Sequence, residues 1–167
     1  FYYASAETEA FGSKSIFFND GPPNAGAPII KRSEDINSLK CPEIADSPVL
    51  NRILKTLTLL KKEASGKIPV IGVVMSPFSL PVMQMGFSKY LDLMIYEKEL
   101  FWKLMKINEE FAEKWANAQV EAGADCICYF DPISSPSITP VELYKKTGFE
   151  IACRTIGKIK AQTATHM

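Results

Sequence analysis

The sequence has 167 residues, of which 47% are hydrophobic and 23% charged, with 19 basic and 19 acidic side chains. This composition is that of an ordinary globular protein, and the length suits one domain. Zero net charge argues against a non-specific nucleic-acid binder, which needs a basic excess to neutralise phosphates. No apolar run reaches the roughly 20 residues that span a bilayer, so the sequence predicts no transmembrane helix.

The four cysteines give no sign of a disulfide or zinc-finger framework. None belongs to a CxxC pair, and their spacing matches no known pattern of that kind. Cys126 and Cys128 lie two residues apart in an apolar run, so on a strand they share one face. We therefore expect these two, and likewise Cys41 and Cys153, to be reduced thiols that pack as small residues in a cytoplasmic protein.

The first 45 residues are irregular apart from short pieces. Their pattern predicts a helix over 6–11 and an extended run over 15–18. A regular helix follows, because Ser47 is a good N-cap and Pro48 fits the first helical position. Gly66 ends this helix. Its apolar residues recur at helical spacing: Val49, Ile53, Leu57 and Leu60.

Two short apolar runs predict buried strands of a parallel sheet, over 68–74 and 125–130, and a third strand is predicted over 163–167. The helices predicted between them cover 78–85, 88–95, 97–121, a segment starting at Thr139-Pro140, and 149–160. This alternation predicts a parallel α/β architecture, either a barrel or an open sheet. No glycine-rich phosphate loop follows a strand, so we favour the barrel over a nucleotide-binding open sheet.

In a barrel of this kind the active groups lie at the carboxyl ends of the strands. Met75, Ser76 and Pro77 follow the first strand. Asp131 follows the second, where a carboxylate can accept a proton or bind a substrate; the alternative is a turn cap, since Asp-Pro often opens a turn. His166, the only histidine, ends the third strand and is either a structural residue or a metal ligand.

Methionine and phenylalanine gather around the end of the first strand. Met75, Phe78, Met83 and Met85 form a soft apolar set. Core packing is the ordinary explanation for such a set, and a wall against a large flat ligand is the alternative. The spacing of these residues leaves both explanations open.

Several segments together resemble the uroporphyrinogen decarboxylase superfamily, in particular its branch of methylcobamide:coenzyme M methyltransferases and related corrinoid-protein methyltransferases. The resemblance covers nearly the whole sequence and rests on the order and spacing of the segments, each of which is only moderately specific. The segments are Glu7–Gly12, Ala27–Asp35, Pro69–Leu80, Gln119–Pro132 and Ala164–Met167. The resemblance implies a TIM-type (β/α)8 barrel, in agreement with the alternation of strands and helices.

The resemblance also implies a zinc-dependent transfer of a methyl group from a methylated corrinoid to a thiol such as coenzyme M. In that branch a strand ends in His-x-Cys-Gly, and its histidine and cysteine bind zinc; His166-Met167 matches the first two positions. On this basis His166 is the expected zinc ligand and Asp131 the expected catalytic residue. Met75, Ser76, Phe78 and Met83 are the expected substrate-binding residues, suited to the approach of a flat tetrapyrrole. The implied partners are a corrinoid protein or free methylcobalamin and a small thiol, with no nucleic acid and no membrane.

Two alternatives remain. The true decarboxylase removes carboxyl groups from uroporphyrinogen without metal or cofactor, but it carries a tyrosine where the nearest residue here is Met83. A non-catalytic corrinoid- or tetrapyrrole-binding module of the same fold is the second alternative. A complete barrel takes roughly 250 residues, so we expect residues 1–167 to be a central fragment of a single barrel domain that lacks its N- and C-terminal parts.

Overall fold

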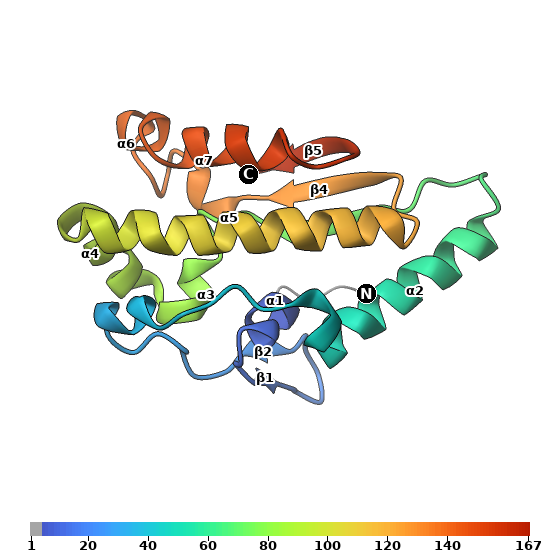
Figure 1. Cartoon of the computed structure of the whole chain (residues 1–167), viewed down its shortest axis with the longest axis horizontal. Helices are drawn as coiled ribbons and strands as arrows, with labels where there is room; N and C mark the ends of the chain where they lie inside the picture. Colours follow the sequence, from blue (N-terminus) through green and yellow to red (C-terminus); the bar gives the residue numbers. More distant parts are fainter. Residues whose placement is uncertain (1–4) are drawn as a thin grey trace.

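The computed structural model describes residues 5–167 (Figure 1). The strands are β1 (Ser15–Ile16), β2 (Asn24–Ala25), β3 (Ile71–Met75), β4 (Cys126–Phe130) and β5 (Gln162–His166). The helices are α1 (Ser5–Ala10), α2 (Pro48–Ala64), α3 (Pro81–Met85), α4 (Phe87–Tyr96), α5 (Lys98–Glu121), α6 (Val141–Lys145) and α7 (Gly148–Ile156). Short 3₁₀ turns cover Ser33–Asn37, Ile44–Asp46 and Pro132–Ser134.

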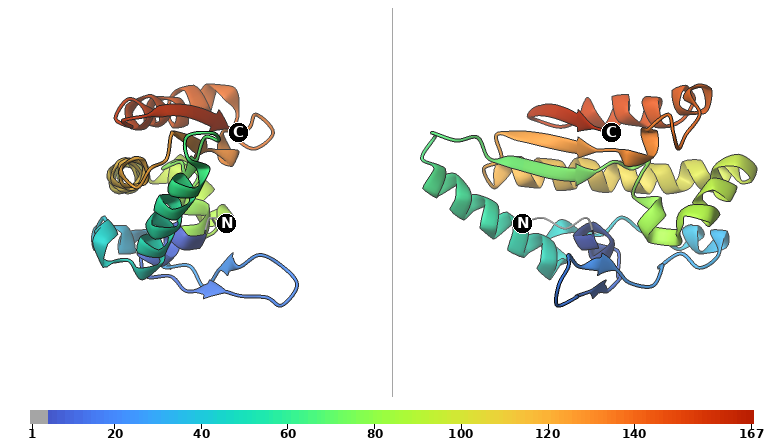
Figure 2. Two further views of the ribbon diagram at one scale, coloured as in Figure 1. Left: turned by 90° about the vertical axis from the view of Figure 1, so that its right-hand side faces the viewer. Right: turned by 180° about the vertical axis from the view of Figure 1, so that it is seen from behind.

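The centre of the fold is a three-stranded parallel sheet in the order β3-β4-β5. Each strand is joined to the next through helices, the kind of connection that parallel strands require. In the right-hand view of Figure 2, α5 and α7 lie behind the strands, and no described helix lies in front of them. Strands adjacent in sequence are therefore adjacent in space and covered by helices on one face, as in a segment of a barrel.

The start of α2 agrees with the sequence prediction. The Ser47 Oγ accepts a hydrogen bond from the Leu50 N–H at 3.4 Å, and Pro48 occupies the first turn. At the other end Ser65 and Gly66 both have left-handed backbones, with φ of 49° and 75°. Because glycine adopts such angles without steric cost, Gly66 ends the helix as its position predicts.

The long helix α5 carries the largest part of the core. Its Phe111 and Trp115 pack with the sheet residues Val74, Ile127 and Tyr129, and all five side chains are fully buried. The first half of the helix packs in a second apolar cluster against α4 and α7. This long amphipathic element is confirmed within one residue of its predicted start.

Two predicted helices are shorter than their sequence patterns suggest. The first begins only at Pro81, because residues 77–80 form a turn in which Ser79 and Leu80 donate backbone hydrogen bonds to the Ser76 carbonyl. The last, α7, ends at Ile156 instead of continuing to residue 160. Asn117 on α5 bonds the Lys158 carbonyl and the residue 160 N–H, at 3.1 and 2.8 Å, which leads the chain out of the helix toward β5.

None of the helices described within residues 5–167 combines the length and apolar character needed to cross a membrane. The two-stranded antiparallel pair β1-β2 lies beside α1, away from the three-stranded sheet (Figure 1). The carboxyl ends of β3, β4 and β5 meet at one edge, where the sequence predicts the site.

Candidate functional site

A row of three side chains crosses the sheet at the carboxyl ends of its strands. Met75, Phe130 and His166 occupy equivalent positions in the register of β3, β4 and β5. Residues paired in register point to the same face of a sheet, so these side chains share one face. The His166 ring lies on that of Phe130, with centroids 5.1 Å apart and planes inclined by 38°. The imidazole is exposed, whereas Met75 is 5% exposed.

Asp131 lies one residue beyond this row and is completely buried. Its Oδ1 accepts hydrogen bonds from the Ser76 Oγ at 2.5 Å and from the Ser79 Oγ at 2.6 Å. Its carbonyl oxygen accepts one from the Ser134 Oγ at 2.6 Å. We call Ser76, Ser79, Asp131 and Ser134 the Asp131 cluster. It ties the loop after β3 to the loop after β4.

The Asp131 cluster contains no positive side chain among the described residues. Burial raises the pKa of the Asp131 carboxyl, and the hydroxyls of Ser76, Ser79 and Ser134 partly offset that rise. The second carboxyl oxygen, Oδ2, has no hydrogen-bond partner within residues 5–167. Burying an ionised carboxylate without a cation is costly, so this environment favours the protonated acid.

Two buried tyrosines, Tyr90 and Tyr129, and the half-buried Tyr144 feel the charge of the same carboxyl. The pKa values of Tyr90, Tyr129 and Tyr144 are all raised, first by burial and then by the negative charge of Asp131. Tyr90 donates its hydroxyl proton to the Phe78 carbonyl at 2.6 Å. These phenols therefore remain neutral and act as hydrogen-bonding groups, and no tyrosinate is available to the site.

The apolar residues expected at the first strand end are largely buried. Phe78 is completely enclosed, with its ring edge-on to Tyr90 and Tyr144 at centroid distances of 6.0 and 6.1 Å. Met85 is 3% exposed and belongs to the same apolar cluster, whereas Met83 is half-buried. Phe78 and Met85 therefore serve as core residues in this structure.

The described residues supply one candidate zinc ligand at the strand ends, His166. No group of three or more histidine, cysteine, aspartate or glutamate side chains within residues 5–167 has the arrangement to hold a metal ion. Cys126 and Cys128 share the face of the sheet with His166 but pair in register with Gln162 and Ala164, nearer the other end of β5. The imidazole suits a zinc ligand chemically, and this part of the chain provides it without a complete site.

Two residues near the strand ends were not predicted from the sequence. Phe130 was assigned only to the strand, although its final position places it against His166. Glu7 on α1 is completely buried, and its Oε1 accepts a hydrogen bond from the Met75 N–H at 2.9 Å. The Phe130 contact follows from the strand register and the Glu7 contact from the packing of α1. The sequence carries a signal for Phe130 alone, because the last residues of parallel strands gather at one edge of the sheet.

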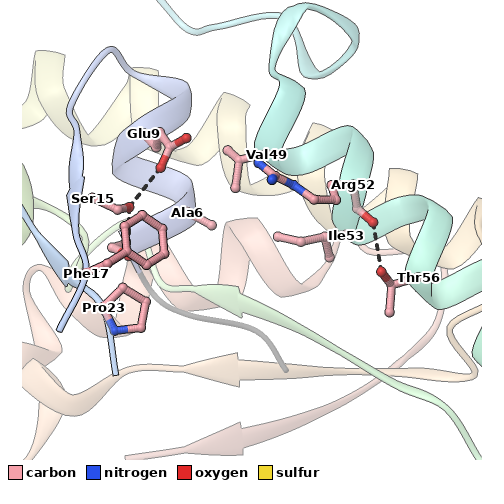
Figure 3. A pocket seen from close by; sticks show the side chains of 10 residues that line it. Ala6, Glu9, Ser15, Phe17, Pro23, Val49, Arg52, Ile53 and Thr56 are labelled. Atoms are coloured by element: carbon pink, nitrogen blue, oxygen red, sulfur yellow. Dashed lines mark hydrogen bonds between the residues drawn. The ribbon is translucent and has the colours of Figure 1, made fainter. Parts of the chain in front are cut away.

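A separate cavity of about 400 Å³ lies between α1, the β1-β2 pair and α2 (Figure 3). Its charged lining residues are Glu9, which accepts a hydrogen bond from the Ser15 Oγ at 2.8 Å, and Arg52. The rest of the lining is mainly apolar, including Phe17 and Val49. None of the residues predicted for the site lines this cavity.

The fold and the strand-end site define a segment of a parallel (β/α) barrel with its candidate groups at the carboxyl end of the sheet. The sequence model of the family described as Uroporphyrinogen decarboxylase (URO-D) matches residues 1–167, so the chain belongs to this family. A solved structure named as a methyltransferase from Methanosarcina mazei superposes with a TM-score of 0.87 at 19% identity. It covers 99% of this chain, which spans 49% of that one. The prediction of part of a TIM (β/α)8 barrel of the uroporphyrinogen decarboxylase type is confirmed.

Curated relatives carry two kinds of enzyme name. The methylcobamide:CoM methyltransferase MtbA of Methanosarcina acetivorans is 31% identical over 144 residues, which are 85% of this chain and 42% of that protein. The uroporphyrinogen decarboxylase of Neisseria gonorrhoeae is 29% identical over 122 residues, 70% of this chain and 34% of that protein. The chain thus spans less than half the length of these relatives. The expected family, and its inclusion of both enzyme types, are confirmed.

Proposed function

We propose that this protein is a corrinoid-dependent methyltransferase, which transfers a methyl group from a methylated corrinoid to a thiol such as coenzyme M. The observation that carries the proposal is the position of His166, an exposed imidazole at the carboxyl end of β5 beside Phe130. Similarity to methylcobamide:CoM methyltransferases over 85% of the chain supports it. The partners in this proposal are a corrinoid protein or free methylcobalamin and a small thiol, in the cytoplasm.

His166 would supply one zinc ligand, and residues 5–167 hold no group of three or more candidate ligands that would complete the site. Bound zinc would lower the pKa of the acceptor thiol, which is near 8.5 when free, so that the thiolate is present at neutral pH. The thiolate sulfur then takes the methyl group as the cobalt–carbon bond breaks, and the corrinoid leaves as cobalt(I). The thiol proton passes to solvent or to a base.

The residues of the chain contribute position and environment. Met75 shares the sheet face of His166, and half-buried Met83 follows it, so these two methionines would line the approach of the flat donor. Phe130 would fix the plane of the imidazole by ring contact. Ser76 and Phe78 reach no solvent, so in this proposal they support the site from beneath.

We retain Asp131 as the acidic residue of the site. Burial raises the pKa of this carboxyl above its ordinary range, as is common for acidic groups of functional sites. The carboxyl and the Ser76 hydroxyl that donates to its Oδ1 are both completely buried. The role of Asp131 is therefore that of a group behind the site and not of a group in contact with the donor.

The second candidate function is decarboxylation of uroporphyrinogen, favoured by the similarity to the Neisseria enzyme over 70% of the chain. The two functions make opposite demands on metal. A decarboxylase would work unchanged after removal of zinc, whereas the proposed methyl transfer would stop. Formation of less carboxylated porphyrinogens from uroporphyrinogen by the protein would replace the first proposal with this one.

The direct test combines the purified full-length protein with methylcobalamin and coenzyme M and follows cobalt(I) by absorbance and the methyl thioether by mass spectrometry. We expect both products, about one zinc per chain, and loss of zinc and activity in His166→Ala. Ser137→Ala is the matched control, because Ser137 is exposed and its Oγ bonds only to that of Ser135. Absence of zinc from protein purified without chelator would contradict the proposal.

A further inference from the structure

The Asp131 cluster is a continuous hydrogen-bonded path between the ends of all three parallel strands. The Ser76 and Ser79 hydroxyls of the loop after β3 both donate to the Asp131 Oδ1. The Asp131 backbone N–H donates in turn to the carbonyl of His166, the last residue of β5, at 2.7 Å. The position of the His166 backbone is thus linked to two serines that are far from it in sequence.

Each serine hydroxyl also accepts a hydrogen bond from a backbone N–H, that of Ser76 within its own loop and that of Ser79 from the loop after β4. The Ser76 Oγ accepts a hydrogen bond from the Ser79 N–H at 2.9 Å, and the Ser79 Oγ accepts one from the Ile133 N–H at 3.1 Å. Ser76 is 0% exposed and Ser79 is 3% exposed, so water cannot replace either hydroxyl. Removing the Ser79 hydroxyl leaves the Ile133 N–H without its partner and weakens the hold on Asp131. Removing the Ser76 hydroxyl weakens the hold on Asp131 alone, because the Ser79 N–H also donates to the Ser76 carbonyl.

Within residues 5–167 the strand that neighbours β5 is β4, with which it pairs in register from Gln162 to His166. At the carboxyl end two further contacts come from the β4 side, the Asp131 N–H on the His166 carbonyl and the Phe130 ring against the imidazole. Both come from consecutive residues at the end of β4, whose loop the serines hold.

We propose that Ser76 and Ser79 are positioning residues for His166, acting through the Asp131 cluster. The inference rests on the proposed function in one respect, the role of His166 as a metal ligand. The positioning itself is a property of the chain and can be measured without metal. A purely structural role for the serines would lower stability and leave the imidazole where it is in the folded protein.

The test compares Ser79→Ala, Ser79→Thr and the exposed control Ser137→Ala in the zinc-free protein. The readout is the ¹³Cε1–¹H signal of the imidazole of His166, identified as the signal that His166→Ala lacks. We expect this signal to shift or broaden in Ser79→Ala. We expect it to stay near its wild-type position in Ser79→Thr, which retains the hydroxyl, and in Ser137→Ala. An unchanged signal in folded Ser79→Ala would overturn the proposal.

Zinc binding by competition with a chelator provides a second readout. Groups that orient a ligand typically change metal affinity 10- to 100-fold, and we expect about 10-fold weaker binding in Ser79→Ala. If the wild-type protein does not bind zinc through His166, the proposed function fails while the imidazole signal still decides the positioning. If wild type binds and Ser79→Ala binds equally well, the positioning role fails alone. Should Ser79→Ala not fold, Ser76→Ala decides by the same signal, because it removes one of the two hydroxyls on the Asp131 Oδ1 while the Ser79 N–H keeps its bond to the Ser76 carbonyl.

Discussion

Gln119 on α5 forms two hydrogen bonds with the backbone of Val73 on β3, in the way that a neighbouring strand would. The Val73 N–H donates to the Gln119 Oε1 at 3.0 Å, and the Gln119 Nε2 donates to the Val73 carbonyl at 2.8 Å. Beside it the Met75 N–H donates to Glu7. Side chains therefore satisfy the edge of β3 that faces away from β4, an edge that would otherwise expose unpaired backbone groups.

Gly72 makes this arrangement possible. A Cβ at this position would lie 2.7 Å from the Ile127 Cδ1 and 2.9 Å from the Gln119 Oε1. We expect Gly72→Ala to lower the free energy of unfolding by about 1–3 kcal/mol, the usual cost of overpacking. Gly21→Ala is the control, because a Cβ there meets no atom within 4 Å. Urea denaturation of both variants measures the difference. Equal stability of Gly72→Ala and Gly21→Ala would show that the Gln119 side chain does not pack closely against β3.

Gln119 itself gives a second prediction. The side chain is 1% exposed, so Gln119→Leu leaves the N–H and carbonyl of Val73 without partners and without access to water. We expect a loss of about 1–3 kcal/mol, together with faster hydrogen exchange at the Val73 amide. The exposed Gln162 on β5 is the control, and Gln162→Leu is expected to change stability by less than about 0.5 kcal/mol. Retained protection of the Val73 amide in Gln119→Leu would refute the assignment.

Two aspartates at opposite ends of β4 predict opposite responses to pH. Burial raises the folded-state pKa of Asp131 above its ordinary value of 3.8. The folded protein then binds more protons than the unfolded chain above this value, so stability falls as pH rises toward the folded-state pKa. We expect Asp131→Asn to remove that fall. Its stability relative to wild type should therefore improve between about pH 4 and neutrality.

Asp125 is the matched control for Asp131. Its pKa is lowered, first by the ammonium group of Lys61 and then by the Val70 N–H. This stabilising effect is present above the unfolded-state pKa and is lost as pH falls through the folded-state value. Asp125→Asn is therefore expected to lose stability at neutral pH and to approach wild type in acid. Urea denaturation of both variants from pH 3 to 8 tests the pair; the same trend for the two variants would contradict the assignments.

The sequence predicted the elements whose signals are local. The cap at Ser47 and Pro48 predicted α2, and the spacing of apolar residues predicted α5, because these patterns depend on a few consecutive turns. The residues at the strand ends were also predicted, since the strands and their direction follow from the alternation with helices. For this reason Asp131 and His166 were identified before the structure, although their roles remain proposals.

The contacts between distant segments could not be predicted in the same way. That Phe130 lies against His166 depends on the register between β4 and β5, which no local pattern specifies. That Phe78 is enclosed in the core depends on Tyr90 and Tyr144, which come from two other helices. Apolar residues at a strand end have the same sequence signature whether they line a site or fill a core.

The core beneath the site gives the last prediction, from two leucines on the same helix. Leu50 on α2 is fully buried in the cluster that also contains Ala6 and Met75, whereas Leu59 on α2 is 63% exposed. Leu50→Ala is expected to cost about 2–5 kcal/mol, because a cavity forms beside the helix that carries Glu7. Leu59→Ala is expected to change stability by less than about 0.5 kcal/mol. Thermal or urea denaturation measures both. Comparable losses of stability in Leu50→Ala and Leu59→Ala would contradict this prediction. They would mean that the face of α2 that carries Leu59 is also covered in solution.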